Sequence, residues 1–94
     1  MAQDDLRTQL VLALPARSGG GPLLARLVAA AARIAPIATV VIEPDPELPI
    51  LPPELAPAVE QIQALGIATL IARDAPLARL VKADGVHLPV SKVA

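Results

Sequence analysis

The chain has 94 residues and a formal net charge of −1, and 54% of its residues are hydrophobic, with no aromatic residue and no cysteine. A chain of this length fits one domain, here residues 1–94, and leaves proportionally more apolar surface uncovered than a longer chain. The missing cysteines exclude disulfides, thiolate catalysis and Cys-type zinc sites. Without aromatic side chains or a basic patch, we expect no nucleic-acid partner.

The longest unbroken apolar run, Leu10–Ala16, is too short to cross a bilayer. Asp4 and Asp5 precede it, where a secretory signal would carry positive charge. We therefore expect a soluble, cytoplasmic protein with no membrane partner.

Four short apolar runs predict β-strands. Their residues are nearly all aliphatic and do not alternate strictly with polar residues, which is typical of strands covered on both faces, as in parallel sheets. The runs are Leu10–Leu14, Ile37–Ile42, Ile67–Ala72 and Gly85–Leu88.

Helical patterns lie between these runs, because apolar residues recur there at intervals of three and four. The first has Pro22 in its first turn, the second ends at Gly66, and the third has Asp74 as its cap and Pro76 in its first turn. The start of the second is uncertain, because Pro53 and Pro57 cannot both lie well inside it. The expected buried stripes are Leu24, Leu27, Val28, Ala31 and Ile34; Leu55, Val59, Ile62 and Leu65; and Leu77, Leu80 and Val81.

Strands and helices thus alternate along the chain, and the fold class is α/β with a parallel (βα) repeat. Parallel strands joined by right-handed helical crossovers form either an open three-layer sheet or part of a (β/α) barrel. In the barrel, the four strands would lie side by side in chain order.

The segment KADGVHL, Lys82–Leu88, is the most specific motif in the chain. With the Gly66–Asp74 stretch before it, it resembles the third and fourth strands of the thiamine phosphate synthase family, which includes the thiazole tautomerase branch. The resemblance implies half of a TIM (β/α)8 barrel and a place in thiamine biosynthesis. It extends more loosely from Leu10 to the end of the chain.

The family enzymes are transferases that join an aminopyrimidine pyrophosphate to a thiazole phosphate, so they need cations and magnesium around the departing pyrophosphate. The family's Gln-x-Arg-x-Lys set corresponds here to Val41, Glu43 and Asp45, which replaces two cations by two carboxylates. Asn-Asp-Arg becomes Ala72–Asp74, and Gly-Gln-Glu-Asp becomes Pro89–Lys92. We therefore predict no cofactor for this chain, although the family uses magnesium, and its status as an enzyme stays open.

Four residues remain candidates for function: His87 and Asp74 for catalysis, and Glu43 and Arg73 for ligand binding. His87 would face the barrel interior, where it could contact a ligand, or it is a hydrogen-bonded histidine of a packed strand. Asp74 is a metal ligand or a helix cap, and Glu43 binds a cation or belongs to a solvated acidic loop with Asp45. We assign no metal site.

Two glycine-containing segments have mainly structural interpretations. Ser18–Pro22 could present backbone amides to a phosphate at a helix N-terminus, or it is a flexible connection. Asp84 and Gly85 are a common turn pair before the fourth strand, for which we expect a backbone role.

Two hypotheses for function follow. The chain is a truncated or degenerate thiamine phosphate synthase-like protein, which a small phosphorylated ligand could still bind. Alternatively, it is a non-catalytic assembly module that closes a barrel with a second chain, for example as a homo-oligomer through its exposed strand edges. An enzyme that uses different residues is a third possibility.

Overall fold

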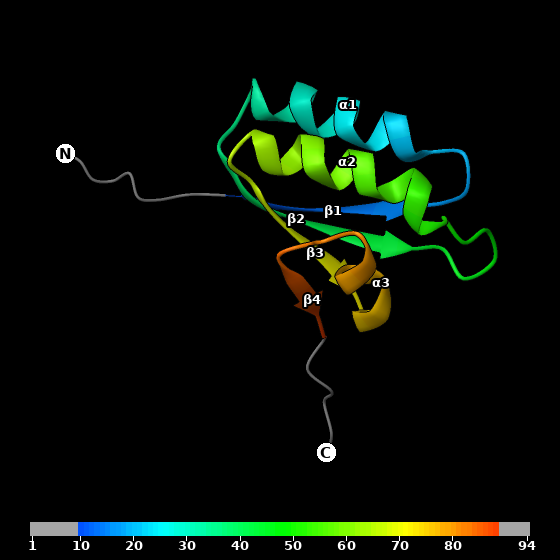
Figure 1. Cartoon of the computed structure of the whole chain (residues 1–94). Coiled ribbons are helices and arrows are strands. Elements are labelled where there is room, and N and C mark those ends of the chain that lie inside the picture. The colour runs from blue at the N-terminus through cyan, green and yellow to red at the C-terminus, as the bar shows by residue number, and fades with distance from the viewer. Residues whose placement is uncertain (1–9, 89–94) are drawn as a thin grey trace, which may run out of the picture.

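The structure is a computed structural model that describes residues 10–88. Strands and helices alternate along the chain, and the four strands form one sheet in the order β1-β2-β3-β4 (Figure 1). All neighbouring strands are parallel, as predicted. The elements are β1 Leu10–Ala16, α1 Gly21–Ala32, β2 Ile37–Pro44, α2 Pro52–Ala64, β3 Ala68–Ala72, α3 Ala75–Leu80 and β4 Gly85–His87.

The strand boundaries differ from the prediction by one or two residues. β1 and β2 each continue two residues further, because Pro15 and Ala16 of β1 pair with Glu43 and Pro44 of β2. A proline is tolerated in β1 because this strand lies at the edge of the sheet. Apolar periodicity did not predict these residues as strand because they include two prolines and a glutamate.

One hydrophobic core lies between the three helices and one face of the sheet. In Figure 1, α1 and α2 lie side by side over that face. The largest fully buried aliphatic side chains are Ile42 and Ile71 from the strands and Leu55 and Ile62 from α2. Full burial of one such side chain contributes about 1.5–3 kcal/mol, so this layer supplies most of the stability.

The buried stripe of α1 matches the prediction only in part. Leu24 and Val28 are buried as predicted, together with Ala25, whereas Leu27 and Ile34 are 46% and 85% exposed. The stripe is rotated because α1 packs more extensively against α2 than against β1 or β2. Ile34 also lies beyond the end of the helix.

The other two helices show similar departures. Leu65 and Leu80, both expected to be buried, are 48% and 64% exposed. Leu65 is the C-cap of α2, and in α3 the buried side is formed by Leu77 and Ala78, with Val81 one turn later. The cap at Gly66 is confirmed: its φ of 82° is the left-handed conformation that favours glycine after a helix.

The opposite face of the sheet has no covering layer among residues 10–88, which corrects the expectation that both faces are covered. Val11, Thr39 and Leu70 point to this side, since they alternate with core residues along their strands, and none of them belongs to the core cluster. The shortest extent of the molecule is 19 Å, which fits two layers. No helix among residues 10–88 has the length and apolarity needed to span a membrane.

Candidate functional site at the carboxyl end of the sheet

The carboxyl ends of parallel strands meet at one edge of the sheet, where α/β proteins commonly bind ligands. The loops that follow β1, β2 and β3 lie at this edge. A cavity of about 260 Å³ opens between the β2–α2 and β3–α3 loops. Its walls are formed by Pro44, Asp45, Pro46, Pro49, Ala72, Arg73 and Asp74.

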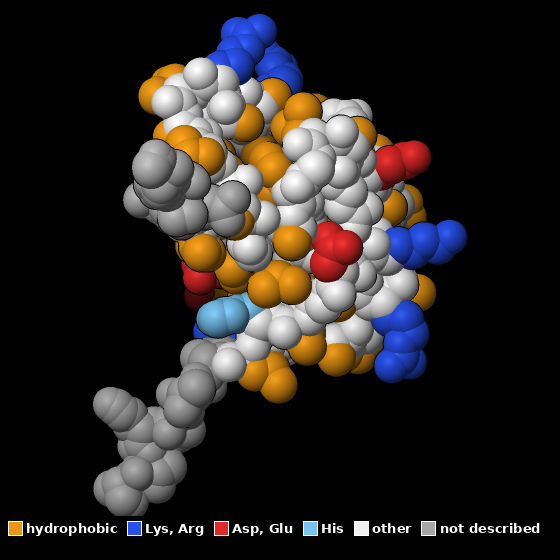
Figure 2. All heavy atoms as spheres, turned by 90° about the vertical axis from the view of Figure 1, so that its left-hand side faces the viewer, with side chains coloured by type: hydrophobic (Ala, Val, Ile, Leu, Met, Phe, Trp, Pro, Cys, Tyr) orange, Lys and Arg blue, Asp and Glu red, His pale blue; other side chains and the backbone are white. Residues whose placement is uncertain are grey.

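The four candidate residues lie along this edge, although only two line the cavity. Arg73 and Asp74 do so. Glu43 and His87 are exposed at the carboxyl ends of β2 and β4, in register with Pro15 and Ala72, respectively. The single histidine, pale blue in Figure 2, is visible at the molecular surface. The arrangement therefore places His87 on the uncovered face of the sheet, opposite to Val86, which packs against the core.

The turn after β3 has an unusual backbone. Arg73 has a φ of 57°, which for a residue with a side chain costs about 1–2 kcal/mol. Its N–H donates to the carbonyl oxygen of His87 over 2.9 Å, so the turn is tied to the end of β4. This hydrogen bond connects two of the candidate residues through the backbone and leaves the Arg73 side chain exposed.

Asp74 is the N-cap of α3. Its Oδ1 accepts a hydrogen bond from the N–H of Leu77 over 3.0 Å, which satisfies one of the unpaired amides of the first helical turn. The helix-cap interpretation of Asp74 accounts for its position without a metal.

We expect Asp74→Ala to lower the free energy of unfolding by about 0.5–2 kcal/mol, because the Leu77 amide loses its acceptor. Urea denaturation followed by circular dichroism measures this change. Asp74→Asn is the matched control, since asparagine caps helices about as well as aspartate and should keep most of the stability. An equal loss in both variants would contradict a capping role.

Asp45 is also engaged within the protein. One of its carboxylate oxygens lies 3.8 Å from Nε of Arg17, and the other accepts from the N–H of Glu47 over 2.8 Å. Backbone hydrogen bonds from Asp45 to Ala16 and from Ser18 to Leu48 join the same two loops. Asp45 thus fixes the β2–α2 loop against the end of β1.

These residues do not fit a magnesium site. No three histidine, aspartate or glutamate side chains come together among residues 10–88 in a way that could hold a metal ion. Asp74 and Asp45 each use a carboxylate oxygen to bind a backbone amide. The segment Pro89–Lys92, which the resemblance aligned with a ligand set, lies outside the described residues.

The glycine-rich loop before α1, Ser18–Gly20, already binds a carboxylate that belongs to the protein itself, the side chain of Glu54. The two carboxylate oxygens of Glu54 accept from the N–H groups of Gly19 and Gly21 over 3.1 and 3.0 Å. Carboxylates are stabilised at helix N-termini, where backbone amides have no helical partner. In this structure Glu54 takes the position considered for a phosphate in the sequence, and it joins α1 to α2.

Asp84 has the backbone role expected from the sequence. Its Oδ2 accepts from the N–H of Thr69 over 2.7 Å and from Nε2 of Gln63 over 3.2 Å, and its own N–H donates to the Thr69 carbonyl oxygen over 2.8 Å. Asp84 therefore joins the start of β4 to β3 and α2.

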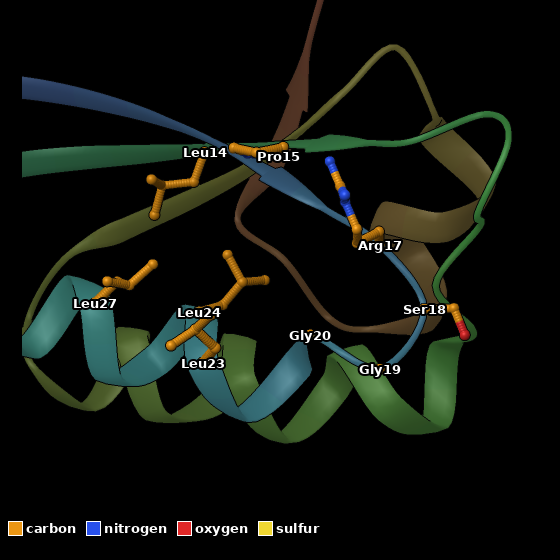
Figure 3. Close-up of a pocket in the computed structure, with 9 residues that line it drawn as sticks. All are labelled: Leu14, Pro15, Arg17, Ser18, Gly19, Gly20, Leu23, Leu24 and Leu27. Carbon is orange, nitrogen blue, oxygen red and sulfur yellow. The ribbon is translucent and has the colours of Figure 1, made fainter.

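A larger cavity, of about 410 Å³, lies between β1 and α1 and reaches this edge at the β1–α1 loop (Figure 3). Leu14 of the strand and Leu24 and Leu27 of the helix point toward one another across it. Arg17 and the glycine-rich loop form one end. The cavity is apolar along most of its length, so it suits aliphatic side chains better than a charged ligand.

Comparison of the chain with known protein families, curated proteins and solved structures finds no match. The family resemblance therefore rests on the sequence motif Lys82–Leu88. Within this motif, Asp84 has the structural contacts described above and His87 lies at the carboxyl end of the sheet.

Proposed function

We propose that the chain is a thiamine phosphate synthase-like half of a (β/α)8 barrel that has lost the pyrophosphate and magnesium chemistry and has a structural role. It contributes four parallel strands, with the helices that connect them, to a barrel, and it has no catalytic activity by itself. The observation that carries this proposal is the sheet itself, with strands in chain order, helices on one face and an apolar, uncovered opposite face. In (β/α)8 barrels the helices lie outside and the second face of the sheet lines the interior.

The strand order favours this architecture over a doubly wound sheet. A doubly wound sheet has helices on both faces, and its strand order reverses at a switch point. The four described strands follow one another across the sheet in chain order, without a reversal, and the three helices between them pack in one core. Both features support the barrel alternative among the two architectures that the sequence left open.

The charge at the carboxyl end of the sheet supports the loss of chemistry. Glu43 and Asp45 occupy the positions where the resemblance places two cations. Unit charges about 4 Å apart interact with about 1–4 kcal/mol between bulk water and a protein surface, so this reversal turns attraction for pyrophosphate into repulsion. Arg17 pairs with Asp45, and Glu43 remains exposed.

Isothermal titration of the 94-residue chain with magnesium pyrophosphate tests the proposal. We expect no saturable heat, because two of the available carboxylates are bound to backbone amides and Glu43 repels the anion. An assay for thiamine phosphate formation on the same sample should give no product. Saturable micromolar binding or measurable product would overturn the proposal.

A further inference from the structure

We infer that the partner completing this sheet is a second copy of the chain, related by a two-fold axis so that β4 of each copy lies beside β1 of the other. The inference rests on the proposed half-barrel and names its partner. Three surfaces carry it: the uncovered face of the sheet, the β1 flank and the β4 flank.

The uncovered face carries no charge except at its carboxyl end. Ala13 of β1, Val41 of β2 and Leu70 of β3 lie on it in register, with Val41 only 5% exposed, and Val11 of β1 is in register with the polar Thr39 of β2. Val11 is 66% exposed. The charged or titratable residues on this face, Glu43 and His87, both stand at the carboxyl ends of their strands. Two such faces can therefore meet across a barrel interior without burying a charge in its middle.

The β1 flank offers a strand edge and a helix groove together. Among the described strands, β1 pairs only with β2, which leaves its outer edge unpaired. Along the same flank α1 exposes Leu23 and Leu27, which are 52% and 46% exposed, over the 410 Å³ cavity. A second cavity, of about 270 Å³, lies at the other end of β1 beside Ile34. The flank thus has room for a strand and for the helix that would accompany it.

The β4 flank has the complementary features. Among the described strands, β4 pairs only with β3, so its outer edge is also open. Leu88, just after β4, is 66% exposed. An unpaired edge beside an exposed leucine is a template for pairing with another strand.

The area of these surfaces matches what a stable dimer needs. With a strand spacing of about 4.8 Å and a rise of about 3.3 Å per residue, the sheet face covers about 350 Å². Grooves as wide as a helix, about 10 Å, and as long as α1 and α3 bring the total to about 600–700 Å² per copy. The pair would bury roughly 1,200–1,400 Å², within the range of specific protein complexes.

A second copy is the occupant that meets all three surfaces at once. A single helix or an extended peptide would cover one of them and leave the other two exposed. Two copies bring together eight parallel strands, the number at which the interior of a barrel is just filled by side chains. The two-fold axis makes both β4–β1 contacts identical, so the assembly closes.

Sedimentation velocity of the full chain over a range of concentrations tests the inference. We expect the mass of two copies for the wild type. Leu27→Lys on the β1 flank and Val11→Lys on the uncovered face should each weaken dimerisation about tenfold or more, because each buries a charge in the contact. Leu65→Lys is the matched control, since Leu65 is 48% exposed and lies at the end of α2, away from all three surfaces.

Circular dichroism melting checks that each variant is folded, and we expect it to be, because the replaced side chains are exposed. A wild-type chain that is monomeric at every concentration would overturn the inference, as would assemblies that grow without closing. Equal weakening by Leu65→Lys would also overturn it. These results are independent of the titration with magnesium pyrophosphate and of the thiamine phosphate assay, which together test whether the chemistry has been lost.

Discussion

Replacing Ile42 by alanine should lower the free energy of unfolding by about 2–5 kcal/mol. Ile42 is fully buried in β2, where it packs in the single core between the sheet and the helices. The substitution removes apolar contacts and leaves a cavity that the surrounding aliphatic side chains fill only in part. Urea denaturation followed by far-ultraviolet circular dichroism measures the change as a shift in midpoint with an unchanged slope.

Ile34→Ala is the matched control for this prediction. Ile34 is 85% exposed beyond the end of α1, so its truncation should change the stability by no more than about 0.5 kcal/mol. Similar losses at Ile34 and Ile42 would contradict the placement of the core.

Gly21→Ala should destabilise the protein by about 1–3 kcal/mol. A Cβ atom at Gly21 would lie 2.8 Å from the backbone oxygen of Glu54 and 2.9 Å from its Cγ, so α1 and α2 would have to move apart. That movement would also lengthen the hydrogen bond between the Gly21 N–H and the Glu54 carboxylate. Thermal or urea denaturation gives the size of the loss.

The sign of the stability change caused by Gly21→Ala shows whether α1 and α2 are in close contact at this residue. Inside a helix, replacing glycine by alanine ordinarily stabilises a protein by up to about 1 kcal/mol, because alanine has the higher helix propensity. Stabilisation by Gly21→Ala would therefore show that α1 and α2 are not in close contact at this point. Glu60→Ala, at an exposed position of α2, is expected to leave the stability nearly unchanged.

Local signals predicted most of the fold. Aliphatic runs identified the four strands, Asp74 marked a helix start through the hydrogen bond that its carboxylate accepts, and Gly66 marked a helix end through the left-handed backbone conformation that glycine allows. The orientation of α1 was not predictable in the same way. Its exposed Leu27 and buried Ala25 depend on packing against α2, and periodicity within one helix carries no information about a second helix.

The candidate site was predictable only in its position along the chain. Chain order places the carboxyl ends of parallel strands at one edge, which is why Glu43, Arg73, Asp74 and His87 all lie along it. The contacts that define their roles are long-range. Glu54 binds Gly19 and Gly21 from more than thirty residues away, and no local pattern around Glu54 signals that contact.

The uncovered face of the sheet also lay beyond sequence reasoning. Runs such as Ile37–Ile42 are aliphatic on both sides of the strand, which led to the expectation of two covering layers. An apolar side chain is compatible with burial inside one chain and with burial between chains. Val11 and Leu70 therefore could not indicate which of the two applies until the helices were placed.

The neighbour-to-neighbour order of the strands has a consequence for how the chain folds and how it can be lengthened. Among residues 10–88, every strand hydrogen-bonds only to those directly before and after it along the chain, so folding can propagate from one βα unit to the next without threading a segment between strands already joined. The paired residues are nevertheless well separated along the chain, as Leu10 and Ile37 are, so we expect slower folding than for a helical bundle of the same size. A tandem fusion that attaches one copy behind another would extend the sheet at its last edge without rearranging any existing pair.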